Sequence, residues 1–405
     1  MQGCAWPISD RILCKQAFGE IMEKRISILG ASGSVGSQAL EVAALRDYRV
    51  DFISGNLAVD KIESAVRRFA PSYACMADER SALELKTRIA DTRTKVLFGE
   101  EGVLEGIREC GSDKIINAIL GKAGLLPTLE ILESGAELAL ANKESLVVAG
   151  DLVMNKARAL GKTIIPVDSE HSAIFQSLSS GAHGELKRII LTASGGPFFG
   201  RKSHELDGIT AADALKHPTW KMGKKITVDS ATLMNKGFEV IEAAHLFNLP
   251  SDRIEVVIHR ESILHSAVEY IDNAVIGEMS VPDMRMCVQY AVEYPRRADA
   301  VIESLDFTKL GTLSFAKPDY EAFPLLSLAG RAAMDGGCSG AVLNAADEIA
   351  VEAFLADKIS FRRISEIVER TYFSLSEAKN SQDLQAILEY DEIARKKARE
   401  LISKI

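Results

Sequence analysis

The sequence lacks the features that mark several classes of protein. No apolar run approaches the roughly 20 residues of a membrane-spanning helix, so we expect no membrane partner. Its six cysteines are scattered and form no C-x-x-C pair, which argues against a zinc site and favours a reducing compartment. The first residues lack a long apolar core with a small-residue cleavage site, so we expect a cytoplasmic location and an N-terminal tail over residues 1–23.

Positive charge is also in deficit. Lysine and arginine number 48 against 57 aspartates and glutamates, which gives a net charge of -9. This balance argues against nucleic acid as the main partner. An anionic substrate would therefore need a local group of cations. A 405-residue chain that is 47% apolar and 26% charged is typical of a globular protein with two or three domains.

Short apolar runs alternate with helical patterns through the first third of the chain. This alternation predicts an α/β fold with a parallel sheet covered by helices, which is a Rossmann-like domain. The predicted strands are 25–29, 48–54, 72–76, 95–98, 115–120, 138–141 and 163–167. The predicted helices are the pattern SQALEVAAL and residues 58–70, 79–90, 101–110, 124–134 and 146–160.

The pattern changes after residue 168. Strand-like runs at 185–196, 225–230, 253–259, 263–272 and 274–280 surround one long helical pattern, which predicts a central α+β domain. The last part is helical by period and predicts a C-terminal helical bundle. We expect a dinucleotide domain over 24–168, a catalytic domain over 169–293 with a lid near 195–225, a linker over 294–319 and a helical domain over 320–405.

The string GASGSVG places glycines at 30, 33 and 36 between the first strand and a helix. Glycines in this position let backbone N–H groups approach a pyrophosphate at a helix N-terminus. A simple tight turn is the other interpretation. NAD sites usually have an acid at the end of the second strand, but Asp51 lies at the start of this one, which favours NADP. No cation for a 2′-phosphate stands out nearby.

Two acidic segments could hold a metal. Asp168 and Glu170 follow a predicted strand, and in extended chain both would face one point. Carboxylate oxygens suit Mg²⁺ or Mn²⁺, although polar residues at a strand exit often meet only water. In DSATLMNKGFE, Asn235, Lys236 and Glu239 share a helix face. An ordinary surface ion pair is the alternative there.

Other segments suggest contacts to an anion. ALANKES places Lys143 at the sheet edge where parallel sheets bind ligands, and TASGGPF offers Ser194 and neighbouring N–H groups to a phosphate. The polar segment that follows contains HPTWKMG, whose apolar residues suit either a mobile lid or a small core under a loop. His259 and His265 flank a strand, where histidines are more often structural than catalytic.

Taken in order, these segments resemble one family. GASGSVG, ALANKESLV, PVDSEHSAIFQ, LTASGGPF, HPTWKMGKKITVDSATLMNKGFEVIEA, IHRESILHS, PDMR and NAADEIAVEAFL together match the 1-deoxy-D-xylulose 5-phosphate reductoisomerases of the non-mevalonate isoprenoid pathway. The resemblance implies a metal-dependent rearrangement of 1-deoxy-D-xylulose 5-phosphate and reduction by NADPH to 2-C-methyl-D-erythritol 4-phosphate. It also implies a homodimer, and the negative net charge predicts no nucleic acid partner.

The resemblance implies a role for individual residues. A divalent cation, Mg²⁺, Mn²⁺ or Co²⁺, would bind Asp168, Glu170 and Glu239. The substrate, a phosphorylated ketose, would contact Lys143, Ser169, Glu170, Ser194, His217, Ser230, Asn235, Lys236 and Glu239. NADPH would contact Ser32, Gly33, Ser34, Val35, Gly55, Asn56, Asn142, Glu144 and Gly223. The lid and pocket would include Trp220, Met222, His265 and Met284.

One departure from the family concerns the cofactor. Members often carry a lysine or arginine followed by asparagine after the second strand, where this chain has Leu57 and Ala58. The contacts to the 2′-phosphate are therefore unassigned. Two alternative functions remain at this point: an NADP-dependent dehydrogenase without an isomerase step, and a nucleotide-sensing relative with an inactive site. The resemblance assigns no role to His171 beyond packing.

Overall fold

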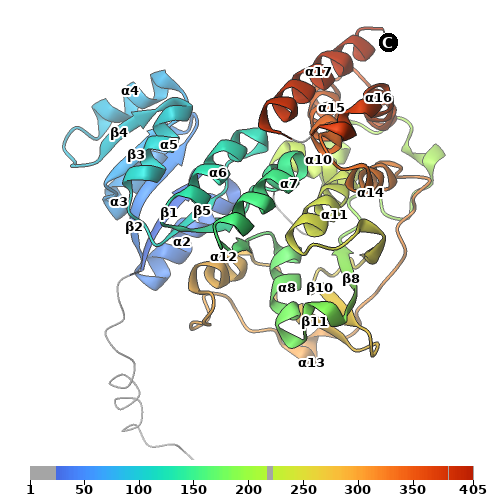
Figure 1. The fold of residues 1–405 in the computed structure, drawn as a ribbon, viewed down its shortest axis with the longest axis horizontal. Coiled ribbons are helices and arrows are strands. Elements are labelled where there is room, and N and C mark those ends of the chain that lie inside the picture. The colour runs from blue at the N-terminus through green and yellow to red at the C-terminus, as the bar shows by residue number, and fades with distance from the viewer. Residues whose placement is uncertain (1–23, 217–221, 382, 405) are drawn as a thin grey trace, which may run out of the picture.

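A seven-stranded sheet forms the centre of the N-terminal part. The computed structural model describes residues 24–216, 222–381 and 383–404 and is shown in Figure 1. All seven strands are parallel, in the order β4-β3-β2-β1-β5-β6-β7. They are β1 Arg25–Leu29, β2 Arg49–Gly55, β3 Tyr73–Met76, β4 Lys95–Phe98, β5 Lys114–Asn117, β6 Glu137–Leu140 and β7 Ile164–Pro166. The Rossmann-like prediction is confirmed.

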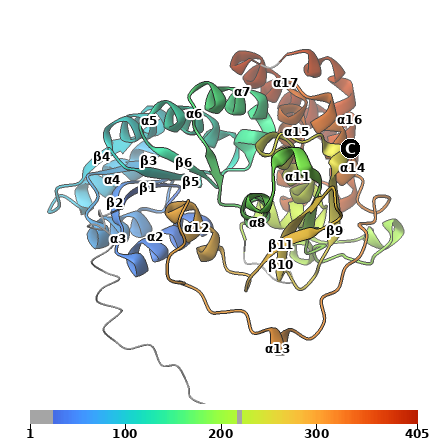
Figure 2. The ribbon, with the colours of Figure 1, turned by 60° about the horizontal axis from the view of Figure 1, so that its bottom comes forward.

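Helices cover both faces of this sheet. Figure 2 shows α5 and α6 on one face and α2 and α3 on the other. The helices are α2 Ser34–Arg46, α3 Val59–Phe69, α4 Glu79–Arg88, α5 Gly99–Glu109, α6 Leu125–Glu133 and α7 Glu144–Ala159, with a 3₁₀ turn η1 Gly121–Gly124. The strand predicted to reach residue 120 ends at Asn117. The buried Asn117 amide donates to the Gly124 carbonyl and to Thr128 Oγ1, both at 2.9 Å, which turns the chain.

The strand order reverses direction at β1, because β2 to β4 extend to one side of it and β5 to β7 to the other. This strand lies between β2 and β5, so the turns after β1 and β5 leave the sheet side by side. Open parallel sheets bind ligands at such a point, outside the carboxyl ends of the strands. The glycine turn and the loop before α6 therefore lie where a dinucleotide would bind.

A second sheet has four strands in the order β11-β10-β8-β9. They are β8 Leu186–Ala193, β9 Ile254–Ile258, β10 Leu264–Tyr270 and β11 Val275–Met279. Strands β8 and β9 are parallel and the other pairs antiparallel. As predicted, a hairpin turn at Asp272 and Asn273 joins β10 to β11, with Asn273 at φ 66°. Its associated helices are α8 Ser169–Ser177, α9 Ala211–Ala214, α10 Lys224–Ala231 and α11 Met234–Leu246.

Two local predictions in this part are wrong. Residues 225–230, predicted as a strand from Ile226, Thr227 and Val228, form helix α10. An ion pair between Lys225 and Asp229, one helical turn apart at 2.7 Å, favours the helix over the β-branched run. The chain at Asp168 is not extended through Glu170 either, because α8 begins at Ser169 with Asp168 as its N-cap.

The C-terminal part is a helical bundle, as predicted. It consists of α14 Leu325–Asp335, α15 Ser339–Leu355, α16 Phe361–Ser374 and α17 Leu384–Ile402. The connector before it runs along the outside of the molecule through the short helix α13 Phe307–Leu310 (Figure 2). Ala316 pairs with Ile258 and so fixes the connector to the edge of β9. None of the helices in the described ranges has the length and apolar character needed to cross a bilayer.

Helix α12, Met284–Glu293, returns to the first sheet. Its Val288, Ala291 and Val292 are buried in the core formed with α2 and α3. At its C-terminal end the buried Lys114 ammonium donates to the Ala291 carbonyl at 2.7 Å, and Glu293 pairs with Lys24 at 2.7 Å. The chain thus adds a late helix to the sheet built by its first third.

Most of the segment predicted as a lid is packed. Phe198, Leu206, Ile209 and Ala214 are buried in the core shared with the bundle, and the ring of Phe198 contacts that of Phe361 edge-on. His217 and Trp220 lie outside the described residues. Residues 195–216 are therefore docked on the bundle, which corrects the lid prediction for this part of the segment.

Candidate active site

Three carboxylates meet where the two sheets approach each other. Asp168 caps α8, Glu170 lies in its first turn, and Glu239 comes from α11. One oxygen from each lies within 4.8 Å of the others, a spacing that could hold a metal ion. The Glu239 side chain is 2% exposed, whereas Asp168 and Glu170 retain 16% and 20%. The group is thus open on the side of α8.

Two lysines lie among these acids. Lys143, which precedes α7, contacts Asp168 Oδ2 at 2.9 Å and Glu239 Oε1 at 2.8 Å. Lys236 from α11 contacts Glu170 Oε1 at 2.7 Å and also pairs with Glu239. The two ammonium groups therefore neutralise most of the acidic charge and do not form the purely cationic patch that an anionic substrate suggested.

Burial and charge set the protonation of this group. Burial raises the pKa of Glu170 to about 7, and the charge of Glu239 adds to the shift. Burial acts the same way on Asp168, but the charges of Lys143 and His171 outweigh it and hold its pKa well below the ordinary value. Asp168 is therefore ionised near neutrality while Glu170 readily takes up a proton, and any divalent cation bound by both must displace that proton.

A second layer of charge lies behind the carboxylates, and the sequence predicted no role for it. His171 is fully buried, with Nε2 3.0 Å from the Glu239 carbonyl oxygen and Nδ1 3.5 Å from Glu242 Oε2. Burial lowers its pKa, but Glu242 and Asp168 raise it to about 9. The signal was available, because Asp168 and His171, like Glu239 and Glu242, are three apart and so share one helix face.

The residues predicted to bind the substrate come from four segments around this centre. Asn235 donates to Glu239 Oε1 at 2.6 Å and accepts from Lys143 at 3.0 Å, while Ser169 donates to Glu170. Ser194 follows β8, and its turn lies against Ser230 at the end of α10. At Gly196, where φ is +66°, an added Cβ would come within 2.5 Å of the Ser230 carbonyl oxygen.

The residues predicted to line the pocket lie on different elements and differ in burial. His265 on β10 is 4% exposed, and burial lowers its pKa to about 4, so it is neutral at physiological pH. Met284 begins α12, which packs against α8. Met222 is half-buried, and the exposed Gly223 is the N-cap of α10. His259 is structural, since its Nε2 accepts the backbone N–H groups of Ile263 and Leu264 at 3.2 Å.

The glycine turn has the close backbone packing of a nucleotide site. An added Cβ at Gly30, where φ is +74°, would lie 2.4 Å from the Ala118 carbonyl oxygen. One at Gly36 would lie 2.2 Å from the Gly30 carbonyl oxygen. Gly33 caps α2, and Ser34 and Val35 form its first turn, whose N–H groups face an incoming anion. The residues present thus fit a pyrophosphate.

The side chain of Asn142 is fully used within the protein. Its Nδ2 lies 2.7 Å from the Ile119 carbonyl oxygen, 2.9 Å from that of Gly121 and 3.0 Å from Glu144 Oε2, so three acceptors share its two protons. Asn142 therefore joins the loop after β5 to the loop after β6. It shapes the edge where the dinucleotide would lie by holding those loops together.

A third acidic group lies under α10. The Lys225 ammonium is 2.7 Å from both Asp229 Oδ2 and Asp347 Oδ2, and Asp347 comes from α15 of the bundle. Asp229 Oδ1 and Asp347 Oδ1 are buried and have no hydrogen-bond partner in the described part of the chain. Two buried carboxylates with one ammonium carry an excess negative charge unless they share a proton. Burial, and then the charge of Asp347, accordingly raise the pKa of Asp229 well above its ordinary value.

This pair makes stability depend on pH. A raised folded-state pKa contributes stability that is complete below the unfolded value and is lost as pH rises through the folded value. Asp347→Asn removes the second charge, so we expect the Tm of the variant minus that of the parent to rise by about 2 °C or more as pH rises from about 4, the ordinary carboxyl value, to about 9. Thermal unfolding at matched ionic strength measures this difference. An equal difference at every pH would show that the two carboxylates share no proton.

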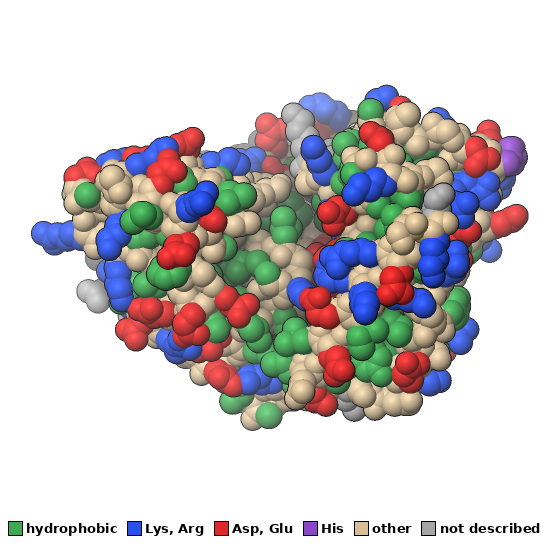
Figure 3. All heavy atoms as spheres, turned by 90° about the horizontal axis from the view of Figure 1, so that it is seen from above, with side chains coloured by type: hydrophobic (Ala, Val, Ile, Leu, Met, Phe, Trp, Pro, Cys, Tyr) green, Lys and Arg blue, Asp and Glu red, His purple; other side chains and the backbone are tan. Residues whose placement is uncertain are grey.

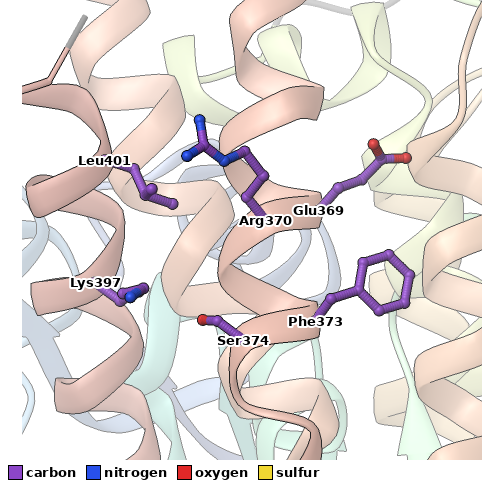
Figure 4. Close-up of a pocket in the computed structure, with 6 residues that line it drawn as sticks. All are labelled: Glu369, Arg370, Phe373, Ser374, Lys397 and Leu401. Atoms are coloured by element: carbon purple, nitrogen blue, oxygen red, sulfur yellow. The ribbon is translucent and has the colours of Figure 1, made fainter.

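The surface is hollowed between the lobe that holds the first sheet and the lobe that holds the rest of the chain (Figure 3). A separate hollow of about 540 Å³ lies between α16 and α17, where Lys397 and Leu401 point toward Arg370 and Ser374 (Figure 4). Its lining contains none of the predicted site residues. That lining consists of Glu369, Arg370, Phe373, Ser374, Lys397 and Leu401.

Three family models match the chain in sequence. The 1-deoxy-D-xylulose 5-phosphate reductoisomerase model matches residues 26–150, the 1-deoxy-D-xylulose 5-phosphate reductoisomerase C-terminal domain matches 164–247, and the DXP reductoisomerase C-terminal domain matches 279–397. The 1-deoxy-D-xylulose 5-phosphate reductoisomerase of Halothermothrix orenii is 47% identical over 382 residues, which cover 94% of this chain and 99% of that one.

Solved structures agree. The Zymomonas mobilis enzyme in complex with NADPH is 40% identical and covers 95% of this chain and 100% of its own, with a TM-score of 0.89. A DOX-P reductoisomerase in complex with NADPH, fosmidomycin and magnesium is 38% identical and covers 94% and 98%, with a TM-score of 0.87. These matches favour the reductoisomerase over both alternative functions, and the chain belongs to the 1-deoxy-D-xylulose 5-phosphate reductoisomerase family.

Proposed function

We propose that Asp168, Glu170 and Glu239 hold the divalent cation of this NADPH-dependent enzyme. The observation that carries the proposal is the meeting of these three carboxylates from two helices within 4.8 Å. The donor set fits, because Mg²⁺ and Mn²⁺ prefer carboxylate oxygens and bind beside open positions for substrate. The contacts of Lys143 and Lys236 with the same oxygens show that this group already attracts positive charge.

The residues around the carboxylates bind 1-deoxy-D-xylulose 5-phosphate. Ser194, Ser230, Asn235 and Lys236 receive its phosphate, with His217 from the segment outside the described residues. The close packing of the turn at Gly196 on Ser230 supports this arrangement, since it places two hydroxyl-bearing segments together. Lys143, Ser169 and Glu170 contact the reacting end of the substrate, because they surround the oxygens assigned to the cation.

The chemistry follows from these positions. A bound divalent cation supplies Lewis-acid polarisation of the ketone and its adjacent hydroxyl. Lys143 stabilises negative charge on the substrate oxygens as the carbon skeleton rearranges, because its ammonium is buried and fixed between Asp168 and Glu239. NADPH bound at the glycine turn would supply the hydride that, together with a proton from solvent, reduces the resulting aldehyde to 2-C-methyl-D-erythritol 4-phosphate. Trp220 and Met222 belong to a lid that excludes water, and His265 and Met284 line the pocket.

The cofactor contacts extend from the turn to both neighbouring loops. Ser32, Gly33, Ser34 and Val35 bind the pyrophosphate, and Gly55 and Asn56 lie at the end of β2 beside the adenosine ribose. Asn142, Glu144 and Gly223 border the nicotinamide side. Their position at the carboxyl edge of the parallel sheet supports this assignment.

The proposal includes the domain boundaries, the oligomeric state and the cellular location of the protein. We assign the dinucleotide domain to 24–168, the catalytic domain to 169–293, the linker to 294–319 and the helical domain to 320–405. Because residues 195–216 are docked on the bundle, we limit the lid predicted near 195–225 to the part after residue 216. Helix α12 returns from the second of these to pack on the first. We also assign a homodimer, and a cytoplasmic location that the free thiols of the four described cysteines support.

The direct test is NADPH oxidation, followed by absorbance at the nicotinamide band with saturating 1-deoxy-D-xylulose 5-phosphate. We expect turnover with Mn²⁺ or Mg²⁺, loss of at least about 100-fold after chelation, and recovery when the metal is restored. NADPH binding, measured by fluorescence, should survive chelation because the glycine turn needs no metal. Full turnover in the chelated protein would contradict the metal site.

A further inference from the structure

The 2′-phosphate of NADPH has no assigned partner, and the structure offers one from a helix. Cofactors of this kind need a cation beside the adenosine ribose. The residues after β2 provide none, because Leu57 and Ala58 are apolar and Leu57 is 67% exposed. We propose that Lys61, in the first turns of α3, binds the 2′-phosphate and sets the preference of this chain for NADPH over NADH. This inference rests on the proposed cofactor site at the glycine turn.

The side chain of Lys61 extends from α3, the helix after β2, to the glycine turn after β1. Its ammonium donates to the Ser32 carbonyl oxygen at 3.0 Å. The first turns of α3 pack directly on the end of β2. An added Cβ at Gly55 would lie only 2.7 Å from Ile62 Cγ1, so the glycine is what allows this close approach. The same added Cβ would lie 3.4 Å from Ser32 Oγ. The end of β2, the start of α3 and the glycine turn thus meet at one point.

The charge of Lys61 is available to a ligand. Within the described residues it makes no ion pair, and its one hydrogen bond uses a single ammonium proton of three. The acids of α3 are already paired: Asp60 contacts Arg88 at 2.5 Å and Glu63 contacts Arg67 at 3.0 Å. Lys61 is also exposed on the surface, so a phosphate can approach it without displacing a protein partner.

The acid that would select NAD is absent from this point. Asp51, the one acid of β2, lies at the opposite end of the strand and is 1% exposed. Its oxygens accept from Arg25 Nε at 3.0 Å and Arg49 Nε at 2.9 Å. Since no carboxylate of β2 faces the ribose, a phosphate there meets the Lys61 ammonium, and the neighbouring acids of α3 are held in ion pairs with Arg88 and Arg67.

The test compares two fragments of the cofactor, 2′,5′-ADP and 5′-AMP, by calorimetry on the protein without substrate. Only the first carries the 2′-phosphate. We expect Lys61→Ala to weaken 2′,5′-ADP by about tenfold or more and to leave 5′-AMP within about twofold. The ratio of kcat/KM for NADPH to that for NADH should fall by a similar factor. Lys61→Arg should keep most of the selectivity, because it keeps the charge.

Arg80→Ala is the matched control, since Arg80 is an exposed cation in the first turn of α4, after the neighbouring strand β3. We expect it to bind 2′,5′-ADP as the parent does. Equal binding of 2′,5′-ADP by parent and Lys61→Ala would overturn the inference, as would a loss shared equally by both fragments. A larger effect of Arg80→Ala would also overturn it. Failure of the parent to bind 5′-AMP would instead contradict the cofactor site itself.

Discussion

Glu239→Gln should lower kcat by about three orders of magnitude or more while leaving NADPH affinity within about twofold. Glu239 is the most buried of the three carboxylates and the one that contacts both lysines. Its amide analogue keeps the size of the side chain but loses the charge that a divalent cation requires. The glycine turn that holds the pyrophosphate follows β1 and depends on none of these oxygens. Steady-state kinetics at saturating Mn²⁺ and NADPH fluorescence titration measure the two quantities.

Glu352→Gln is the control for this prediction, because Glu352 is exposed on α15 and the change in charge is the same. We expect it to match the parent in both measurements. Thermal unfolding of Glu239→Gln should show a folded protein, since Lys143 keeps Asp168 and Lys236 keeps Glu170 as partners. A folded Glu239→Gln variant with parental turnover would remove Glu239 from the metal site.

Lys236→Met should have opposite effects on two ligands. Its ammonium contacts Glu170 and Glu239, so the lysine and a divalent cation compete for the same oxygens. Removing the ammonium should tighten Mn²⁺ binding by about tenfold, because less positive charge remains near the carboxylates. The KM for 1-deoxy-D-xylulose 5-phosphate should rise by about 100-fold, because the phosphate loses a buried charged partner. Calorimetry with Mn²⁺ alone and steady-state kinetics separate the two effects.

Lys396→Met provides the matched control, since Lys396 is exposed on α17. It should leave both constants unchanged. If Lys236→Met weakened Mn²⁺ binding and substrate binding together, Lys236 would serve mainly to hold Glu170 and Glu239 in place. An unchanged KM would exclude Lys236 from the phosphate site.

The sequence predicted the parallel sheet well because strands buried on both faces leave apolar runs, and because a parallel sheet needs a helix between its strands. It was wrong at α10, where a run of β-branched residues favoured a strand. That error has a physical reason: the helix is stabilised by Lys225 with Asp229 and with Asp347, a residue far along the chain. Local propensity carries no information about such a distant partner.

The sequence predicted which residues form the centre of the site but not how all of their charges are paired. Motif spacing grouped Asn235, Lys236 and Glu239 on one face and paired Asp168 with Glu170, and the resemblance joined Glu239 to that pair. The spacing of Lys236 and Glu239 indicated an ion pair, which the structure contains in buried form. No pattern indicated that Lys143 would pair with Asp168 and Glu239, since that depends on how α7, α8 and α11 pack together. The contact of Lys61 with Ser32 was hidden for the same reason, because it joins two segments through the fold and not through a motif.

Helix α12 has a consequence for synthesis of the chain. The first sheet is encoded before residue 167, yet Val288, Ala291 and Val292 fill part of the core beneath it. A nascent chain that has emerged only through β7 must leave that apolar surface exposed until more than a hundred further residues follow. Folding of the N-terminal sheet on the ribosome therefore completes late, and a fragment ending at residue 168 should expose this surface and tend to aggregate.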